Sequence, residues 1–379
     1  MPVVGVIGGG QLARMMQPAA IALGIELRVF AETEGSSAYQ AATKVGDYTE
    51  LEKLREFCQG IDALTFDHEH VPTHLLDALE VEGVSVRPGP SALIHAQNKL
   101  TMRRKLSELG LPMPSWASAK TASDVQDFLN SHGPEIVVKT PIGGYDGKGV
   151  RVIGSVAEVA DWLSSIDKYG SELLLEEKVK FVGECAQLSA RNPSGEFKTW
   201  PLVRTVQSSG VCDEVIAPYG TQDQQTRAEK IARAVSEGLG VVGVLAVELF
   251  ELEGGDLVVN ELAMRPHNSG HFSIEGSITS QFEQHLRAVL DLPLGETGLL
   301  GEAVVMLNLL GIDSRNDFVS QYPDAMKSFP SAKFHTYQKE PRLGRKMGHI
   351  TLVGNDAAEL LAQGRAAREV LYRGGQEDR

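Results

Sequence analysis

Short apolar runs alternate with stretches of helical periodicity over the N-terminal quarter of the chain. The apolar runs cover residues 3–7, 25–30 and 63–66, and apolar positions recur at helical spacing over residues 12–23 and 51–58. Strands and helices in this order predict a parallel, doubly wound α/β domain. We expect it to cover residues 1–95, since the chain turns at residues 87–91.

The pattern changes after that turn. A helix is predicted over residues 92–109, and a small α+β lid at about residues 115–180 contains apolar strands on both sides of a glycine-rich loop. Antiparallel strands and helices follow to residue 295. We therefore expect a mixed α/β and α+β chain with domains at residues 1–95, 96–295 and 296–379.

Two apolar runs at residues 241–250 and 256–261 flank a Gly-Gly turn and predict a hairpin. If its loop spans residues 253–256, Leu252 lies opposite Leu257 and Glu248 lies opposite Glu261, with Cβ atoms roughly 5 Å apart. Opposed carboxylates destabilise a ladder unless a cation lies between them, and Mg²⁺ suits carboxylates combined with phosphates. The alternative is a slipped register, in which Glu248 is a solvated edge residue.

The residues after this hairpin combine several reactive side chains in one short segment. Arg265, His267 and His271 follow Asn260 and Glu261 within twelve residues. A guanidinium matches an oxyanion in shape and stays charged, and an imidazole exchanges protons near neutral pH. The segment is typical of an active site, although His267 and His271 could instead have structural roles.

Two glycine-rich segments are candidate phosphate sites. The first turn, Gly8-Gly9-Gly10-Gln11-Leu12-Ala13, satisfies G-x-G-x-x-A, and Glu32 follows at the distance of a ribose-binding acid. Taken alone, it favours NAD, with a different phosphate or a structural turn as alternatives. The second segment, residues 143–149, joins two strands and could close over a polyphosphate beside Lys139 and Lys148, or be an exposed turn.

Composition excludes several classes of protein. The 379 residues carry a net charge of −14 without a long basic run, which argues against binding duplex nucleic acid. Three cysteines without metal-ligand spacing predict neither a disulfide framework nor a zinc site. No apolar run reaches roughly 18 residues and no secretory signal is evident, so we expect a cytoplasmic protein that does not enter the membrane.

Several motifs occur in the order seen in a known superfamily. The glycine-rich flap, the apolar hinge at residues 173–179, Glu184 and the Glu248/Asn260-Glu261 set resemble the ATP-grasp enzymes. Residues 8–15, Gly143 to Gly149, Arg265 to His271 and Arg345-Lys346-Met347-Gly348-His349 are similar to the N5-carboxyaminoimidazole ribonucleotide synthetase family of purine biosynthesis. The resemblance spans nearly the whole chain.

The resemblance implies an ATP-grasp fold and a reaction in which ATP, Mg²⁺ and bicarbonate carboxylate 5-aminoimidazole ribonucleotide through carboxyphosphate. It also implies a homodimer. It implies that Mg²⁺ is held by Glu248 and Glu261. The implied ATP-binding residues are Lys99, Lys139, Gly144, Tyr145, Asp146, Gly147, Lys148, Gly149, Glu176, Glu177, Lys178, Val179, Glu184, Asn260 and Glu261.

The same resemblance assigns residues to the aminoimidazole substrate and to the chemistry. The implied substrate-binding residues are Gly10, Gln11, Leu12, Glu69, Arg265, His267, Asn268 and Lys346. The implied catalytic residues are Glu69, Tyr145, Asp146, Arg265, His267 and Lys346. Around Glu69 the sequence Asp-His-Glu-His departs from the usual Glu-Phe-Glu-Asn pattern of the family.

Three other functions compete with this interpretation. A formate-dependent glycinamide ribonucleotide transformylase shares the fold and ATP, but Tyr145-Asp146 and Lys346 to His349 argue against it. An NAD-dependent oxidoreductase would use Gly8 to Ala13 with Glu32, but leaves Glu248 and Glu261 unexplained. A non-catalytic nucleotide-binding module would not need Arg265 and His267.

Overall fold

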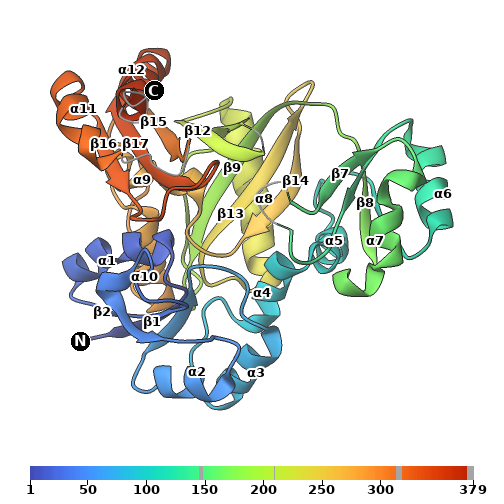
Figure 1. Cartoon of the computed structure of the whole chain (residues 1–379), viewed down its shortest axis with the longest axis horizontal. Coiled ribbons are helices and arrows are strands. Elements are labelled where there is room, and N and C mark those ends of the chain that lie inside the picture. Colours follow the sequence, from blue (N-terminus) through green and yellow to red (C-terminus); the bar gives the residue numbers. More distant parts are fainter. Residues whose placement is uncertain (145–147, 209, 313–317, 374–379) are drawn as a thin grey trace.

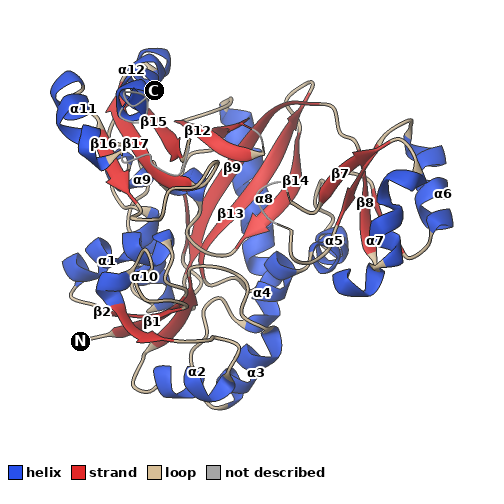
Figure 2. Cartoon of the chain, viewed as in Figure 1, coloured by secondary structure: helices blue, strands red, loops and turns tan. Residues whose placement is uncertain are grey.

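The computed structural model describes residues 1–144, 148–208, 210–312 and 318–373 (Figure 1). Within these ranges the strands form three sheets with helices against them (Figure 2). Figure 1 shows the N-terminal sheet and the lid at different ends of the molecule, with the long strands of a central sheet between them. No helix in the described ranges is long and apolar enough to cross a membrane.

The N-terminal sheet is parallel, as the alternation of strands and helices predicted. Its order is β3-β2-β1-β4, formed by β1 (Val3–Ile7), β2 (Glu26–Ala31), β3 (Ala42–Val45) and β4 (Ala63–Phe66). The helices of this region are α1 (Gln11–Leu23), α2 (Leu51–Phe57) and α3 (Thr73–Val81). The prediction missed β3 because this short edge strand has no continuous apolar run.

The predicted single helix over residues 92–109 is wrong. The chain forms α4 (Pro90–Gln97) and α5 (Lys99–Glu108), separated by Asn98 in an extended conformation (φ −132°, ψ 109°). The Asn98 side chain accepts hydrogen bonds from the backbone N–H groups of Leu100 and Thr101, which caps α5. The break places Lys99 in the first turn of the second helix.

The lid has its own antiparallel sheet in the order β5-β8-β6-β7. Its strands are β5 (Trp116–Ala119), β6 (Ile136–Lys139), β7 (Val150–Ile153) and β8 (Leu173–Glu177). The helices α6 (Ala122–His132) and α7 (Ala160–Ser164) belong to the same region. The glycine-rich segment joins β6 to β7, as predicted.

Among the described residues, the central sheet has nine strands and continues into the C-terminal region. Its order is β14-β13-β9-β11-β12-β15-β17-β16, with β10 paired to β9. The strands are β9 (Phe181–Arg191), β10 (Phe197–Thr199), β11 (Val203–Ser208), β12 (Val211–Ala217), β13 (Gly243–Leu252), β14 (Leu257–Ala263), β15 (Ala303–Leu310), β16 (Lys333–Thr336) and β17 (Lys346–Gly354). Strands on both sides of residue 295 therefore share one sheet, and the domain boundary there stays a prediction.

The remaining helices belong to the central and C-terminal regions or are short 3₁₀ turns. The α-helices are α8 (Gln222–Leu239), α9 (Ser273–Gly276), α10 (Gln281–Val289), α11 (Tyr322–Ser328) and α12 (Ala357–Arg373). The described 3₁₀ helices are η1 (Tyr39–Ala41), η2 (Val156–Val159), η3 (Ile166–Tyr169), η4 (Asn268–Gly270) and η5 (Val319–Gln321).

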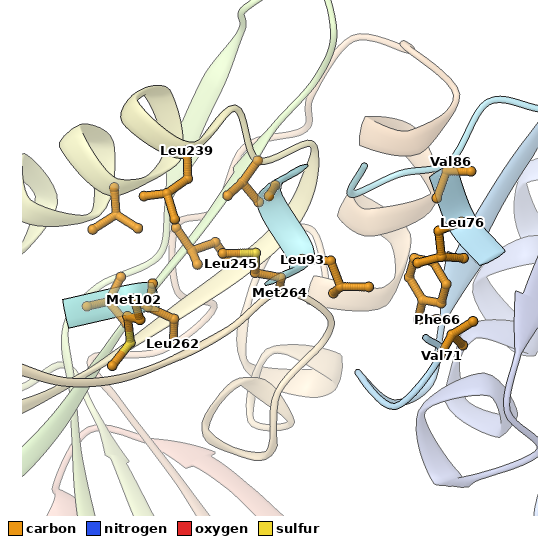
Figure 3. Packing of buried hydrophobic residues seen from close by; sticks show 14 of the residues in the cluster. Phe66, Val71, Leu76, Val86, Leu93, Met102, Leu239, Leu245, Leu262 and Met264 are labelled. Atoms are coloured by element: carbon orange, nitrogen blue, oxygen red, sulfur yellow. The ribbon is translucent and has the colours of Figure 1, made fainter. Parts of the chain in front are cut away.

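One apolar core joins the N-terminal sheet to the β13–β14 hairpin. Phe66 of β4, Leu93 of α4, Met264 after β14, Leu262 and Met102 belong to one buried cluster, and Figure 3 shows Leu93 between Phe66 and Met264. Each fully buried side chain of this size contributes about 1.5–3 kcal/mol to folding. The packing fixes the hairpin relative to the N-terminal domain, and the hairpin carries the candidate site.

Candidate active site

The two hairpin carboxylates face each other, but not for the reason that the sequence suggested. Glu248 pairs with Glu261 across the β13–β14 ladder, as predicted, so the slipped register is excluded. The predicted pairing of Leu252 with Leu257 is wrong, because Leu257 lies opposite Glu251. Next to the turn, the pairing of the two strands is therefore shifted by one residue from the expected register.

A β-bulge between the turn and the two carboxylates shifts the pairing back to the expected register. The pairing shifts by one residue between Glu248 and Leu249, and the extra residue on β14 is Asn260. In a bulge, two residues of one strand oppose a single residue of the other. Asn260 and Glu261 consequently both line the cavity that Glu248 lines.

Each carboxylate has a different basic partner. Lys99 Nζ lies 2.9 Å from Glu261 Oε1, and His267 Nε2 lies 3.1 Å from Glu248 Oε1. Burial opposes ionisation of Glu248, but the hydrogen bond with His267 and nearby positive charges outweigh it, so the pKa of this carboxyl lies below its ordinary value. Glu248 is therefore held as an anion.

The hairpin opens onto a cavity of about 600 Å³. Most of the residues predicted to bind ATP or metal line it together. They are Lys139, Glu176, Glu177, Lys178, Val179, Glu184, Glu248, Asn260 and Glu261, joined by the predicted substrate residues His267, Asn268 and Lys346. Residues from β6, β8, β9, β13, β14 and β17 thus converge on one space large enough for a nucleotide.

The donor set suits Mg²⁺. Glu248 and Glu261 supply carboxylate oxygens, and Asn260 adds an amide oxygen next to them. No group of three or more His, Cys, Asp or Glu side chains able to hold a metal occurs among the described residues. A small set of oxygen ligands, with no more than two carboxylates, is typical of a magnesium ion that completes its shell with phosphate and water.

A buried charge network lies at the lid side of the cavity. Lys139 Nζ is 2.8 Å from Glu176 Oε2 and donates to Asn260 Oδ1 at 3.0 Å. Glu176 is also paired with Arg103, which is fully buried. Burial opposes its ionisation, but Lys139 and Arg103 hold the pKa of Glu176 below its ordinary value. The sequence prediction missed Arg103, which had no local signal to separate it from its basic neighbours on the helix.

The far end of the cavity has groups that fit a nucleoside. Glu184 of β9 lines it, and burial raises the pKa of this carboxyl, an effect that Gln207 of β11 opposes. Phe181 and Phe250 also line it and stack with ring centroids 4.6 Å apart. Gln207, Phe181 and Phe250 were not predicted, since a lone amide or aromatic in a strand is more often part of the fold.

At this end of the cavity, the polar side chains at the end of β8 and just after it bind other parts of the protein. Glu177 Oε1 accepts a hydrogen bond from Ser115 N at 2.9 Å, and Lys178 Nζ lies 2.5 Å from Glu135 Oε2. With these side chains bound to the protein and Glu177 N donating to Ser115 O, the remaining backbone groups up to Val179 are the part of the segment suited to the edge of a base.

The ends of the glycine-rich flap are described, whereas Tyr145, Asp146 and Gly147 lie outside the described residues. Thr140 N donates to Gly149 O at 2.9 Å. Gly149 has φ +74°, and a Cβ there would meet Thr140 Oγ1 at 2.4 Å. A Cβ at Gly144 would lie 2.8 Å from Lys148 O. The close approach of the two ends requires glycine at both positions.

His267 is held in place by its neighbours. Its Nδ1 lies 2.8 Å from Ser269 Oγ, and its backbone N–H donates to Gln281 Oε1 at 2.8 Å. Gln281 Nε2 donates in turn to His267 O and lies 2.9 Å from His271 Nδ1. His271 is fully buried beside aromatic rings, so the structure supports its structural interpretation.

Arg265 is paired with Glu69, which follows β4. The Arg265 Nε to Glu69 Oε2 distance is 2.7 Å, and Glu69 Oε1 accepts from Met264 N at 3.2 Å. Burial works against the charge of Arg265, but Glu69 outweighs it and raises the pKa of the guanidinium. Asn268 exchanges two side-chain hydrogen bonds with Asn308 of β15, at 3.0 and 2.7 Å.

Carboxylates surround the first glycine turn. Glu32 Oε2 accepts from Gly9 N at 3.0 Å, and Asp67 Oδ1 accepts from Ala13 N at 2.8 Å. A Cβ at Gly10 would lie 2.0 Å from Asp67 Oδ2, so only glycine fits there. Glu32 also binds His68, whose ring stacks on His70.

The chain after β16 covers the same turn. Lys339 Nζ donates to Gln11 Oε1, and Arg14 donates to Thr336 O at 3.1 Å and to Gln338 Oε1 at 2.7 Å. Lys346, in contrast, lines the main cavity. Lys339 was not predicted, because its approach to Gln11 depends on how the C-terminal strands pack.

Three family models match the chain. The ribonucleotide synthetase preATP-grasp domain matches residues 1–97, the ATP-grasp domain matches residues 104–282, and the phosphoribosylaminoimidazole carboxylase C-terminal domain matches residues 304–363. These matches follow the three regions of the fold in order.

Individual proteins are similar over the full length. The N5-carboxyaminoimidazole ribonucleotide synthase of Corynebacterium ammoniagenes is 46% identical, covering 100% of this chain and 94% of its own. An ADP complex of an N5-carboxyaminoimidazole ribonucleotide synthetase superposes with a TM-score of 0.88 at 31% identity, covering 99% of this chain and 98% of its own. The Aspergillus clavatus enzyme, solved with ADP and 5-aminoimidazole ribonucleotide, has a TM-score of 0.88 at 30% identity, covering 98% and 99%.

Proposed function

This chain belongs to the N5-carboxyaminoimidazole ribonucleotide synthase family of ATP-grasp ligases, and we propose that the cavity beside Glu248 and Glu261 is its active site. The enzyme carboxylates 5-aminoimidazole ribonucleotide in an ATP-dependent reaction of purine biosynthesis. The observation that carries the site assignment is the opposed carboxylate pair, which lines one cavity together with Lys139 and Asn260 and is paired with Lys99 through Glu261.

The hairpin and the lid together hold ATP. Glu248, Glu261 and Asn260 are the residues that would hold Mg²⁺, which neutralises charge on the transferring phosphoryl group when bound. Lys99 and Lys139 contact the phosphates as point charges. Lys99, which pairs with Glu261 in the structure, would turn to a phosphate oxygen in the ATP complex.

The nucleoside occupies the far end of the cavity. The backbone of residues 176–179, which includes Glu176, Glu177, Lys178 and Val179, hydrogen-bonds the adenine edge, and Glu184 accepts from the ribose hydroxyls. The flap residues Gly144, Tyr145, Asp146, Gly147, Lys148 and Gly149 close over the phosphates. Closure also keeps water away from a labile carboxyphosphate.

Arg265 and His267 act on the one-carbon substrate. Bicarbonate attacks the γ-phosphorus of ATP, the bond to the bridging β–γ oxygen breaks, and ADP and carboxyphosphate result. The Arg265 fork, oriented by Glu69, grips the bicarbonate and carboxyphosphate oxygens. The aminoimidazole nitrogen then bonds to the carboxyl carbon as the bond from that carbon to the phosphate oxygen breaks, and the departing phosphate takes the amine proton. His267 lies near the reacting carboxyl group and can donate a hydrogen bond to it from Nε2.

The aminoimidazole ribonucleotide lies between the flap and the N-terminal domain. Tyr145 and Asp146 meet its ring and amine, while Gly10, Gln11 and Leu12 bind the phosphoribosyl group at the start of α1, beside Lys339. Lys346 adds positive charge from the main cavity, which it lines. Glu69 and Asn268 complete the contacts. The first glycine turn is therefore a monophosphate site and not a dinucleotide site.

The proposal also covers the oligomeric state, the cellular location and the domain boundaries. We expect a homodimer in the cytoplasm, with domains over residues 1–95, 96–295 and 296–379. Sedimentation of the purified chain tests the dimer, and fractionation of cells that produce it tests the location.

ADP release is the direct test of the function. ADP is measured from ATP, Mg²⁺ and bicarbonate, with and without 5-aminoimidazole ribonucleotide, and glycinamide ribonucleotide plus formate is the control. Stimulation by the aminoimidazole alone is expected. Stimulation by the control pair would move the assignment to the transformylase, and no ADP with either pair would leave a nucleotide-binding module.

A further inference from the structure

Arg103 is a fully buried arginine at the junction of three elements around the active site. It lies on α5 and donates from Nε to Glu176 Oε1 at 2.6 Å. Its Nη1 donates to Val259 O at 3.2 Å and its Nη2 to Asn260 O at 2.8 Å. One guanidinium therefore joins α5, lid strand β8 and hairpin strand β14.

The two carbonyls that Arg103 binds are consecutive. Successive carbonyls of a regular strand point toward opposite edges, so a single side chain cannot ordinarily reach both. Asn260 is the extra residue of the bulge, and the bulge turns its carbonyl toward the outer edge of β14, beside that of Val259. Val259 N on the same edge donates to Pro112 O at 2.8 Å. Arg103 thus satisfies the carbonyl that the bulge removes from the ladder.

The same contacts form a closed ring of four residues. Arg103 binds Glu176, Glu176 binds Lys139 at 2.8 Å, and Lys139 donates to the Asn260 side chain at 3.0 Å. The Asn260 backbone then returns to Arg103 at 2.8 Å. The ring carries two positive charges and one negative charge, so it stays net positive beside the cavity.

We propose that Arg103 is a positioning residue for the Mg²⁺·ATP site. Arg103 holds the bulge that turns Asn260 and Glu261 into the cavity, and through Glu176 it also orients Lys139. Without the bulge, the register at the turn would set Glu248 opposite Asn260, and Glu261 would face the other side of the sheet. Arg103 touches no substrate and acts through these neighbours. The inference rests on the proposed roles of Glu248 and Glu261 at the metal.

The role requires arginine and not merely a positive charge. The guanidinium binds a carboxylate and two carbonyls from three different nitrogens, whereas an ammonium presents a single nitrogen. The neighbouring Met102 lies beside Leu262 of β14 in the apolar core, so α5 holds the guanidinium at a fixed distance from the hairpin (Figure 3).

The test compares Arg103→Met and Arg103→Lys with two matched controls. Arg104→Met removes the same charge from the next residue, which is exposed and paired with Glu172. Leu106→Ala truncates a fully buried side chain of the same helix, which destabilises the fold without touching the ring. All four are assayed at a temperature at which each is folded by circular dichroism.

Both Arg103 variants are expected to raise the KM for ATP and the Mg²⁺ concentration for half-maximal rate by about tenfold, the effect of one lost charged hydrogen bond. The KM for 5-aminoimidazole ribonucleotide should change less than twofold. Calorimetry of ADP binding should show the same weakening with Mg²⁺ and a smaller one in EDTA. Both controls should keep the wild-type ATP and Mg²⁺ dependence.

Wild-type ATP and Mg²⁺ dependence in Arg103→Met would overturn the proposal, as would a Leu106→Ala profile that matches it. If Arg103→Met does not fold, the same measurements on Arg103→Lys decide. Failure of the metal assignment is recognised separately, because Glu261→Gln would then turn over normally while the Arg103 variants could still be impaired in ADP binding.

Discussion

Glu248 and Glu261 lie directly opposite each other on β13 and β14, and each carboxylate is bound by a side chain from outside the hairpin. Lys99 reaches Glu261 from α5, and His267 reaches Glu248 from the loop after β14. Opposed like charges would otherwise weaken the ladder. The protein thus places a hydrogen-bonding partner on each carboxylate of the pair that we propose as the Mg²⁺ site.

Glu261→Gln should lower kcat by on the order of a hundredfold or more, because a preorganised charge at the phosphoryl group is lost. The fold should be retained, since glutamine has the same shape. ADP release and thermal unfolding measure the two effects. Glu253→Gln, at the exposed hairpin turn, is the matched control. Near wild-type turnover in Glu261→Gln would remove Glu261 from the metal site.

Arg265→Lys should lose most of the activity despite keeping the charge. Lysine cannot bind Glu69 through one edge and an oxyanion through the other, so kcat/KM for bicarbonate should fall by about tenfold or more. Arg287→Lys, whose arginine pairs with Glu283 on α10, should change little. Full activity in Arg265→Lys would contradict the proposed grip on bicarbonate.

Ser269→Ala should reduce kcat by about two- to tenfold with little change in KM for ATP, because one hydrogen bond that orients His267 is removed. Steady-state kinetics over a pH series measures the change. Ser277→Ala is a suitable control, since the buried Ser277 hydroxyl makes no hydrogen bond in the structure. Equal kinetics in both variants would show that His267 does not depend on Ser269.

His285 should make the fold sensitive to mild acid. Val244 N donates to its Nδ1 at 3.0 Å, so its protonated Nε2 donates to Thr65 Oγ1 at 2.7 Å. Burial lowers the pKa of His285 from an ordinary 6.5 to about 3. As the pH falls, this histidine is therefore protonated in the unfolded chain before it is protonated in the folded one. The contribution of neutral His285 to the free energy of unfolding is complete above pH 6.5 and declines as pH falls toward 3, by about 1.4 kcal/mol per pH unit.

His285→Leu should lower the free energy of unfolding by about 1–3 kcal/mol at pH 7.5, since Val244 N loses its acceptor. Its stability should fall less than that of the wild type between pH 6.5 and 5. Urea unfolding at several pH values measures both, with the exposed His74→Leu as control. Parallel curves for wild type and His285→Leu would show that His285 is not the group that responds.

Local sequence patterns predicted the helices and strands that depend little on contacts with residues far away in the sequence. Strands β1 and β4 begin and end where their apolar runs do, and the parallel N-terminal sheet follows from strand–helix alternation. The opposed carboxylates were also predicted, but the register assumed at the turn was wrong by one residue. The bulge at Asn260 shifts the pairing by one residue, so Glu248 still lies opposite Glu261. No local signal marks this bulge.

The sequence by itself determined the α/β and ATP-grasp character of the chain and the residue types of the site, because periodicity, turns and motifs act over a few neighbouring residues. Only the tertiary structure decided the break at Asn98, the contact of Lys339 with Gln11 and the role of Arg103. Arg103 is 73 residues from Glu176 and 157 from Asn260. Such contacts depend on how separate elements pack, because burial and charge pairing act between side chains that meet only in the folded chain.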